Sequence, residues 1–314
     1  MDREQEGCAT VVLTQERLAA LVDEVRPFLK GGSVSTYLPA LARARVGDIE
    51  VAVDLGGSRF LRAGDRCGRF SMQSVVKIFT LLLALHDRGE SYVFERVGRD
   101  QAVGAFNSFE TFERTTGIPA NPFVNSGALT VVDMLRGDGA QEKVARVLRL
   151  VRGVSGNTTI GVDEDLARSE LEHSDRNRAL CYFLRSSGLM SSDVEDVLWA
   201  YCQLCAIEVG VADLARAARA LSDDTWTSPD DGMPPARDVR TVRRLMLTTG
   251  MYAASGEYAC TVGVPAKCGV SGATIGIVPG VGGIGIYGPS LDEEFNSVGG
   301  LRLMELLSEA LAVR

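Results

Sequence analysis

The stretch FSMQSVVKIFTLLLAL, residues 70–85, places a serine and a lysine three positions apart where a polar segment passes into an apolar run. The apolar run is typical of a buried helix, and we expect a helix from Gln73 to His86. In such a helix Ser74 lies in the first turn, and Lys77 lies one turn later on the same face. The pair is therefore either a reaction centre or the polar start of a buried helix.

The chemistry of the pair favours the first interpretation in principle. A serine hydroxyl is a weak nucleophile until a base removes its proton, and a lysine amine that burial keeps neutral is such a base. The N-terminus of a helix adds a positive dipole end that favours developing negative charge. The spacing S-x-x-K is also the nucleophile motif of serine β-lactamases and penicillin-binding enzymes. The motif is short, however, and taken alone it is explained more simply as the start of a helix.

Lysine usage adds to the functional interpretation. Four of the 33 basic residues are lysines: Lys30, Lys77, Lys143 and Lys267. Arginine keeps its proton near neutral pH, whereas a desolvated lysine can lose it. The two histidines, His86 in the apolar run and His173 in a polar stretch, lack a setting typical of a Ser-His-Asp site. We therefore expect another residue type to transfer protons.

Composition limits the class of protein and its partners. The chain has 314 residues, 46% hydrophobic and 24% charged, which is typical of a globular protein with one large core or two lobes. A net charge of -8 argues against nucleic acid or an anionic membrane as the main partner. The apolar runs are shorter than the roughly 20 residues that span a bilayer, and the polar N-terminal segment resembles no secretory signal. We expect a cytoplasmic protein.

Cysteine usage predicts free thiols rather than a metal site. The seven cysteines are Cys8, Cys67, Cys181, Cys202, Cys205, Cys260 and Cys268. An odd number in a reducing cytosol is expected to stay unpaired. Cys202 and Cys205 form a C-x-x-C, but neither a second cysteine pair nor a histidine cluster lies nearby, as a zinc site would require. We expect no metal and no organic cofactor.

The order of predicted elements indicates an α/β protein. Helices are predicted at both ends of the chain, at 14–30 and at 298–312. A β-hairpin is predicted at 48–65, and strands are predicted at 257–264, 273–280 and 282–289. Between the hairpin and these strands the patterns are mainly helical, with a loop at 228–235. The strands thus lie near both ends of the chain. We expect a single domain, residues 1–314, with a sheet lobe at about 1–70 and 255–314 and an inserted helical lobe at about 71–254. A pocket between two such lobes suits a small molecule.

Two more short motifs follow the S-x-x-K in the order that the β-lactamase group uses. Lys267-Cys268-Gly269 precedes a glycine-rich strand, where that group has K-[ST]-G. Asn125, in NPFVNSGAL, lies between the two lysine motifs. Three weak signals in the right order favour a reaction centre over a chance helix start.

Longer segments resemble the bacterial-type, serine-dependent glutaminase family, which has a serine β-lactamase-like fold. The segments that carry the resemblance are VSTYLPALA (34–42), FSMQSVVKIF (70–79), VGRDQAVGAFNS (97–108), NPFVNSGAL (121–129), SELEHSDRNRAL (169–180) and GMYAASGEYACTVGVPAKCGVSG (250–272). They run in the family's order over nearly the whole chain. The resemblance therefore implies an antiparallel sheet from the two chain ends, an all-helical insertion and hydrolysis of L-glutamine to L-glutamate and ammonia.

The resemblance also implies the catalytic roles. Ser74 is the implied nucleophile and Lys77 the implied general base, and the backbone N–H groups of Ser74 and Val270 form the implied oxyanion hole. Tyr37, Tyr252 and Lys267 complete the implied catalytic group. The family further implies a homodimer or homotetramer with a small-molecule substrate.

The implied substrate-binding residues are Ser74, Asn125, Glu170, Asn177, Tyr201, Tyr252 and Val270. Their chemistry suits an amino acid, because a glutamate carboxylate pairs with an α-ammonium and asparagine amides donate to carboxylate or amide oxygens. Without the resemblance, simpler interpretations hold: Asn125 and Asn177 as loop caps, Glu170 as a solvated helix residue and Tyr201 as core.

Three departures from the family's pattern keep the substrate open. Cys268 replaces the serine of K-S-G, Phe295 stands where a glycine is usual, and the segment at 34–37 lacks the usual aspartate. A related amidase or acyl-transfer enzyme for a different γ-amide is therefore an alternative, as is a non-catalytic glutamine-binding homologue. A β-lactamase or penicillin-binding hydrolase is a further rival, but it would need a cell-wall address.

Overall fold

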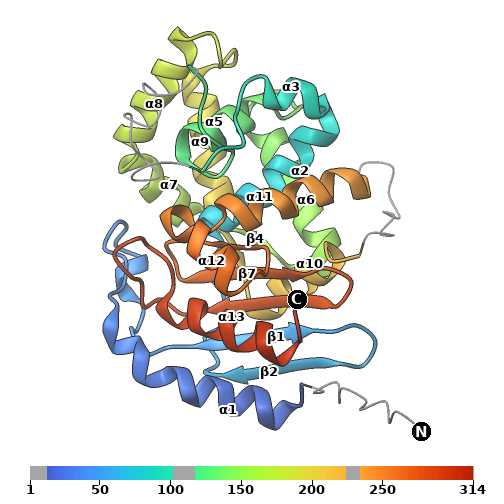
Figure 1. Ribbon diagram of the computed structural model, residues 1–314. Coiled ribbons are helices and arrows are strands. Elements are labelled where there is room, and N and C mark those ends of the chain that lie inside the picture. Colours follow the sequence, from blue (N-terminus) through green and yellow to red (C-terminus); the bar gives the residue numbers. More distant parts are fainter. Residues whose placement is uncertain (1–12, 102–116, 224–233, 314) are drawn as a thin grey trace, which may run out of the picture.

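A computed structural model describes residues 13–101, 117–223 and 234–313. Part of the segment 97–108, most of the loop predicted at 228–235, and Cys8 lie outside the described residues. Figure 1 shows a twisted sheet with helices on both of its faces and a larger group of helices beyond one face. The N-terminal helix lies below the sheet in this view, and the C-terminal helix lies in front of it.

The main sheet has five strands in the order β2-β1-β8-β7-β6, and each neighbouring pair is antiparallel. The strands are β1 (Glu50–Asp54), β2 (Phe60–Gly64), β6 (Ala266–Cys268), β7 (Ala273–Val278) and β8 (Gly282–Tyr287). Val51 of β1 lies opposite Ile286 of β8, so the two ends of the chain meet in the middle of the sheet. The prediction of an antiparallel sheet built from N- and C-terminal segments is confirmed.

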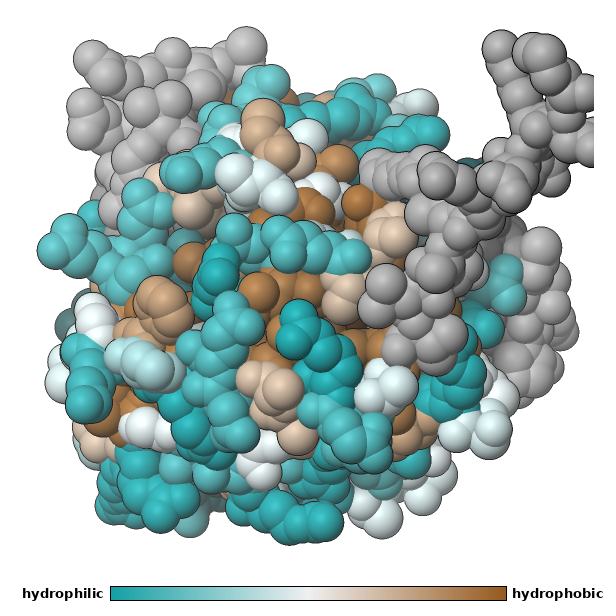
Figure 2. All heavy atoms as spheres, turned by 60° about the horizontal axis from the view of Figure 1, so that its bottom comes forward, coloured by the Kyte–Doolittle hydropathy of each residue, from teal (hydrophilic) through white to brown (hydrophobic). Residues whose placement is uncertain are grey.

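Two helices cover one face of this sheet. Val51 and Ile286 belong to an apolar cluster with α1 (Gln15–Val25) and α13 (Val298–Ala310). Helix α1 is amphipathic, burying four apolar residues and exposing charged ones. Figure 2 shows this side of the molecule as mostly hydrophilic, with apolar atoms visible between the polar side chains.

Helix α10 (Val211–Ala220) covers the other face and lies directly on β8. A Cβ atom on Gly283 would lie 2.2 Å from the Ala215 carbonyl oxygen, and one on Gly285 would lie 2.2 Å from the Val211 carbonyl oxygen. Only glycine leaves room for this approach, because real Cβ atoms do not come so close. Although α10 falls within residues 71–254, it packs on the sheet, and the division into two lobes stays a proposal.

The remaining helices build the upper group in Figure 1. They are α2 (Lys77–Arg88), α3 (Glu90–Phe94), α5 (Asn125–Met134), α6 (Gly139–Ser155), α7 (Glu164–Glu172), α8 (Asp175–Ser186), α9 (Val194–Cys205) and α11 (Ala236–Thr249). The short 3-10 turns of the described residues are η1 (Arg26–Gly31), which packs against α1 and α13, and η2 (Leu41–Arg43), η3 (Gln73–Val76) and η4 (Tyr252–Ala254). A second sheet, in the order β3-β5-β4, joins Phe70–Ser71, Ile207–Val209 and Gly161–Val162. This small sheet leads the chain into η3, where Ser74 lies.

Three local predictions differ from the structure. The strand predicted at 257–264 is replaced by helix α12 (Ser255–Thr261), whose Tyr258 is buried against the α1/α13 cluster. Tertiary packing therefore overrides the strand preference of this segment. The helix predicted at 14–30 ends at Val25 and continues as η1, because Pro27 cannot continue the α-helical hydrogen bonds. The helix predicted from Gln73 begins as the 3-10 turn η3 and becomes α-helical at Lys77.

Among the residues that the structure describes, no helix has the length and apolar character needed to cross a bilayer. The apolar run at 78–85 lies inside the protein as part of α2, where ten of the twelve residues are buried. The run is apolar because its side chains form part of the core of the helical group.

Candidate functional site

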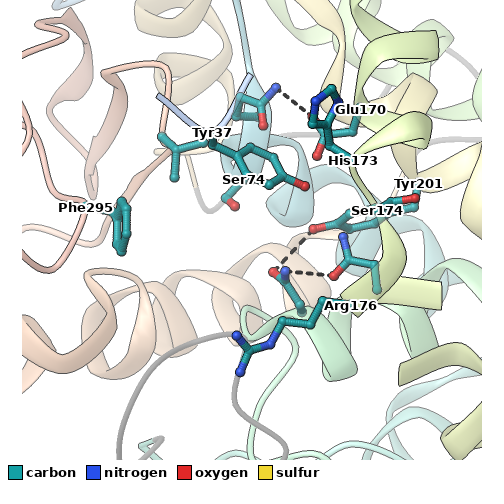
Figure 3. Close-up of a pocket in the computed structure, with 12 residues that line it drawn as sticks. Tyr37, Ser74, Glu170, His173, Ser174, Arg176, Tyr201 and Phe295 are labelled. Carbon is teal, nitrogen blue, oxygen red and sulfur yellow. Dashed lines mark hydrogen bonds between the residues drawn. The ribbon is translucent and has the colours of Figure 1, made fainter. Parts of the chain in front are cut away.

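A pocket lies where η3 meets the end of β6 and the helices α5, α7, α8 and α9. The cavity has a volume of about 140 Å³. It is lined by Tyr37, Gln73, Ser74, Asn125, Glu170, His173, Ser174, Arg176, Asn177, Tyr201, Val270 and Phe295. Figure 3 shows Ser74 near the middle of this ring of side chains. Seven of the sequence-predicted site residues therefore share one pocket.

The chain turns sharply just before Ser74. Gln73 has a φ of 45°, in the left-handed region that non-glycine residues seldom adopt. This turn presents the Ser74 side chain to the pocket, although the residue is only 7% exposed. Strain of this kind is common at functional sites, where the surrounding packing maintains it.

Lys77 lies behind the pocket wall, 1% exposed. Its Nζ donates hydrogen bonds to the Phe123 carbonyl oxygen at 3.1 Å and to Asn125 Oδ1 at 2.8 Å. Burial, followed by repulsion from Lys267, lowers the pKa of Lys77 from 10.5 to about 7. A substantial fraction of neutral amine is therefore present near neutral pH.

A second buried lysine and a tyrosine lie on the β6 side of Ser74. Lys267 is fully buried, with Nζ 2.7 Å from the Cys268 carbonyl oxygen and 3.9 Å from the Tyr252 ring centroid. Burial lowers the pKa of Lys267 to about 8. The Tyr252 hydroxyl is hydrogen-bonded to Ser74 and donates to the Cys268 carbonyl oxygen at 3.5 Å. Burial raises the pKa of Tyr252 well above 10.0, so the phenol stays protonated.

The end of β6 packs tightly against the Ser74 turn. A Cβ atom on Gly269 would lie 2.7 Å from the Met72 carbonyl oxygen and 3.2 Å from Ser74 N. The glycine therefore lets the backbone of Val270 approach the backbone of Ser74. Among the hydrogen bonds between described residues, neither the N–H of Ser74 nor that of Val270 has an acceptor. Both groups can donate to a negatively charged oxygen near Ser74.

The other end of the pocket is polar and buried. Glu170 is 3% exposed and accepts hydrogen bonds from Gln73 Nε2 at 3.3 Å and from the Tyr37 hydroxyl. Burial raises the pKa of Glu170 against the lowering effect of these hydrogen bonds and of Lys77. A cationic ligand group beside Glu170 would favour its charged form.

Asparagines and a tyrosine connect this polar end to Lys77. Asn125 Oδ1 accepts from Lys77 and, at 3.4 Å, from the Tyr201 hydroxyl, while Asn125 Nδ2 donates to Asn177 Oδ1 at 3.0 Å. Both asparagines line the pocket. The hypothesis of simple loop caps does not account for a network that contains Lys77.

Four pocket residues were not identified from the sequence: Gln73, His173, Ser174 and Arg176. Each lies within one to four residues of a predicted one, inside a segment already singled out. Helix α8 begins at Asp175, so its first turn brings Arg176 and Asn177 to the pocket together. The polar character of these residues, next to a motif, was the available signal. Conversely, Lys77, Tyr252 and Lys267 do not line the pocket but support it from behind.

The two clearest departures are adjacent in space. The Cys268 thiol is fully buried and donates to Asn296 Oδ1 at 2.7 Å. Burial raises the pKa of Cys268, so the thiol stays neutral. Phe295, next to Asn296, lines the pocket with a φ of 65°. The side chain of Cys268 thus does not enter the pocket, whereas that of Phe295 does.

No cluster of three or more histidine, cysteine, aspartate or glutamate side chains in the described ranges has an arrangement that could hold a metal ion. All six cysteines in these ranges are unpaired, Cys202 and Cys205 included.

A family model described as glutaminase matches residues 32–314 of the chain. The chain belongs to the glutaminase family. It is 39% identical to a glutaminase from Clostridium tetani over 302 residues, covering 95% of this chain and 98% of the relative. It is 41% identical to a glutaminase from Shouchella clausii over 299 residues, covering 94% and 96% of the two chains.

The structure agrees with this assignment. A crystal structure of a probable glutaminase from Bacillus subtilis superposes on it with a TM-score of 0.86 at 33% identity, covering 95% of this chain and 96% of the other. The protein therefore has the β-lactamase-like fold of the glutaminases, an antiparallel sheet with many helices. The rival assignment to β-lactamases or penicillin-binding enzymes is not needed to explain the S-x-x-K motif.

Proposed function

We propose that the protein hydrolyses L-glutamine to L-glutamate and ammonia through an ester on Ser74. Membership of the glutaminase family supports both the substrate and the reaction in this proposal. The observation that supports the mechanism is that Ser74 lines a pocket, with the buried Lys77 one turn later and with Tyr252, which is hydrogen-bonded to Ser74, packed against the buried Lys267.

In the first step the Ser74 oxygen bonds to the δ-carbon of glutamine, and the serine proton passes to neutral Lys77, directly or through Tyr252. The N–H groups of Ser74 and Val270 donate to the oxygen that becomes negative. Losing one such donor typically costs about 3–4 kcal/mol of transition-state stabilisation. The C–N bond then breaks, and the ammonium form of Lys77 returns a proton to the departing nitrogen.

In the second step water replaces ammonia. Lys77 removes a proton from a water molecule, whose oxygen attacks the ester carbon and releases glutamate. The proton then returns to the Ser74 oxygen. Each turnover thus consumes one water and restores both the hydroxyl and the amine. No metal or organic cofactor takes part in these steps.

The polar end of the pocket suits the amino-acid part of the substrate. The Glu170 carboxylate pairs with the α-ammonium, and Tyr37 orients that carboxylate by its hydrogen bond. The side-chain amides of Asn125 and Asn177 and the Arg176 guanidinium supply donors for the α-carboxylate. Tyr201 closes this side of the pocket and positions Asn125.

The test is ammonia release from glutamine by the purified protein and by three variants. Ser74→Ala should lose at least about a thousandfold in kcat, and Lys77→Met about 10²–10⁴-fold. Ser71→Ala is the matched control, because the Ser71 hydroxyl is buried and has no hydrogen-bond partner among the described residues. It should retain activity. Glutamine binding without ammonia release by the folded wild type would instead establish a non-catalytic homologue.

The oligomeric state and the cellular location of the protein are also proposals. Assembly as a homodimer or homotetramer is supported by the family resemblance alone, and sedimentation velocity would test it. A cytoplasmic location is supported by the six unpaired cysteines, which are typical of a reducing compartment. Cell fractionation would test it.

A further inference from the structure

Phe295 places an aromatic ring in the pocket at the expense of backbone strain. Its φ of 65° lies in the left-handed region, where a residue with a Cβ atom costs roughly 1–2 kcal/mol. The side chain is 41% exposed and lines the pocket. A glycine would adopt this conformation without strain, so the ring is present despite the local backbone preference.

The loop that carries Phe295 is held in place by hydrogen bonds. Asp292 Oδ1 accepts from the backbone N–H groups of Glu294 at 2.9 Å and Asn296 at 2.8 Å, and the Asp292 carbonyl oxygen accepts from Phe295 N at 3.1 Å. The Asn296 side chain accepts from the Cys268 thiol at the end of β6. The backbone that carries the ring is therefore anchored to the strand that leads to Val270.

Ser74 lies between this ring and the polar end of the pocket. In Figure 3, Phe295 is on one side of Ser74, and Glu170, His173 and Tyr201 are on the opposite side. A γ-amide whose ammonium pairs with Glu170 and whose δ-carbon reaches Ser74 extends its nitrogen away from Glu170. The amide nitrogen and any group attached to it then lie towards Phe295.

We propose that Phe295 forms an apolar subsite for the leaving amine, so that the enzyme accepts γ-glutamyl amides whose nitrogen carries an apolar alkyl or aryl group. This inference rests on the proposed function, because it uses the same nucleophile and the same ammonium site. The aromatic face gains contact with an apolar substituent, whereas the small NH₂ group of glutamine leaves the ring in contact with water.

The same bonds form and break as in glutamine hydrolysis, with a primary amine in place of ammonia. The Ser74 oxygen bonds to the δ-carbon, the bond from that carbon to the substituted nitrogen breaks, and Lys77 returns the serine proton to the departing primary amine. Water then releases glutamate from the ester. The products are glutamate and one free amine.

The experiment compares glutamine with γ-glutamyl-ethylamide and γ-glutamyl-benzylamide, measuring glutamate because all three substrates release it. Wild type, Phe295→Gly and Phe295→Leu are assayed for kcat/KM. Phe28→Ala is the control, because Phe28 is another exposed ring, 51% exposed, outside the pocket lining. Phe295→Gly removes strain, so it is expected to fold.

For Phe295→Gly, the ratio of kcat/KM for the benzylamide to that for glutamine should fall roughly tenfold, and Phe295→Leu should lie between it and wild type. Phe28→Ala should keep the wild-type ratio. A ratio that stays constant or rises in Phe295→Gly would overturn the proposal, since the ring would then be inert or an obstruction. If no substrate releases glutamate in a Ser74-dependent way, the proposed function itself fails, and this inference fails with it.

Discussion

Replacing Lys267 by methionine should move the acidic limb of the pH–activity profile to higher pH. Burial is the largest cause of the low pKa of Lys77, and repulsion by Lys267 is the next. Lys267, with a pKa of about 8, is mostly charged when Lys77 titrates near pH 7. Because neutral Lys77 is the proposed base, activity rises with pH through its pKa. Removing the repulsion raises that pKa.

The size of the effect is limited by the total change in the pKa of Lys77. That pKa falls from 10.5 to about 7, and burial is the larger cause, so repulsion by Lys267 lowers it by roughly 1–1.5, or about 1.4–2 kcal/mol. The midpoint of the limb should therefore rise from about pH 7 to roughly pH 8–8.5. Methionine suits the substitution because it is apolar, close to lysine in length, and enters a fully buried site.

The assay is kcat/KM for ammonia release from pH 5.5 to 10, because this parameter reports the free enzyme's ionisations. Lys143→Met is the matched control. Lys143 is also buried, with Nζ bonded to the carbonyl oxygens of Val132 and Asp133, and burial likewise lowers its pKa. It is not part of the pocket, and its removal should leave the limb at the wild-type pH.

A limb that stays in place, or moves to lower pH, in a folded Lys267→Met protein would refute this reasoning. If the variant turns over too slowly for a profile, the rate at which a fluorophosphonate labels Ser74 replaces ammonia release. That rate depends on the same base, so its midpoint should show the same rise.

Three further predictions concern stability and thiol reactivity. Gly285→Ala should lower the free energy of unfolding by about 3 kcal/mol or more, measured by urea denaturation, because the new Cβ collides with α10. Arg146→Met should cost about 3–5 kcal/mol at pH 7, because buried Asp87, which accepts from Arg146 Nη2 at 2.7 Å, loses its charged partner and keeps only the Arg136 backbone N–H. Burial raises the pKa of Asp87, but its hydrogen bonds to Arg146 and to a backbone N–H lower the pKa by more than that, so the pKa lies below its usual value of 3.8. This stabilisation is therefore present above about pH 4 and disappears as pH falls through the lowered value; an equal cost at pH 3 in urea melts would contradict it. Iodoacetamide at pH 8 should modify exposed Cys260 and spare buried Cys268, with activity retained; peptide mass spectrometry showing labelled Cys268 in active enzyme would contradict the burial argument.

Patterns in the sequence predicted the architecture well where they repeat over a whole element. The hairpin at 48–65 and the strands at 273–280 and 282–289 alternate strictly enough to identify β1, β2, β7 and β8. The segment at 257–264 looked equally strand-like but is helical, because Tyr258 packs in the α1/α13 cluster. In a short segment, the free energy gained by burying a side chain outweighs the intrinsic preference for strand.

The candidate site was located by sequence motifs, but its layout was not. The motifs named Ser74, Glu170 and Asn125 from three distant segments, and the structure places them in one pocket. Nothing in spacing alone indicates that Lys77 bonds to Asn125 rather than facing the solvent. That contact links α2 with α5, and only the folded chain brings those helices together.

The sequence by itself determined the family, the chemistry-bearing residue types and the existence of a sheet from both chain ends, because these depend on residue identity and local periodicity. Tertiary structure alone decided which lysine is poised to lose its proton, since a pKa depends on burial and on charges far away in sequence. It also decided that Cys268 is a buried thiol and that Phe295 faces the substrate pocket. Two equally visible departures thus have different consequences, because the fold directs one side chain inward to Asn296 and the other into the pocket.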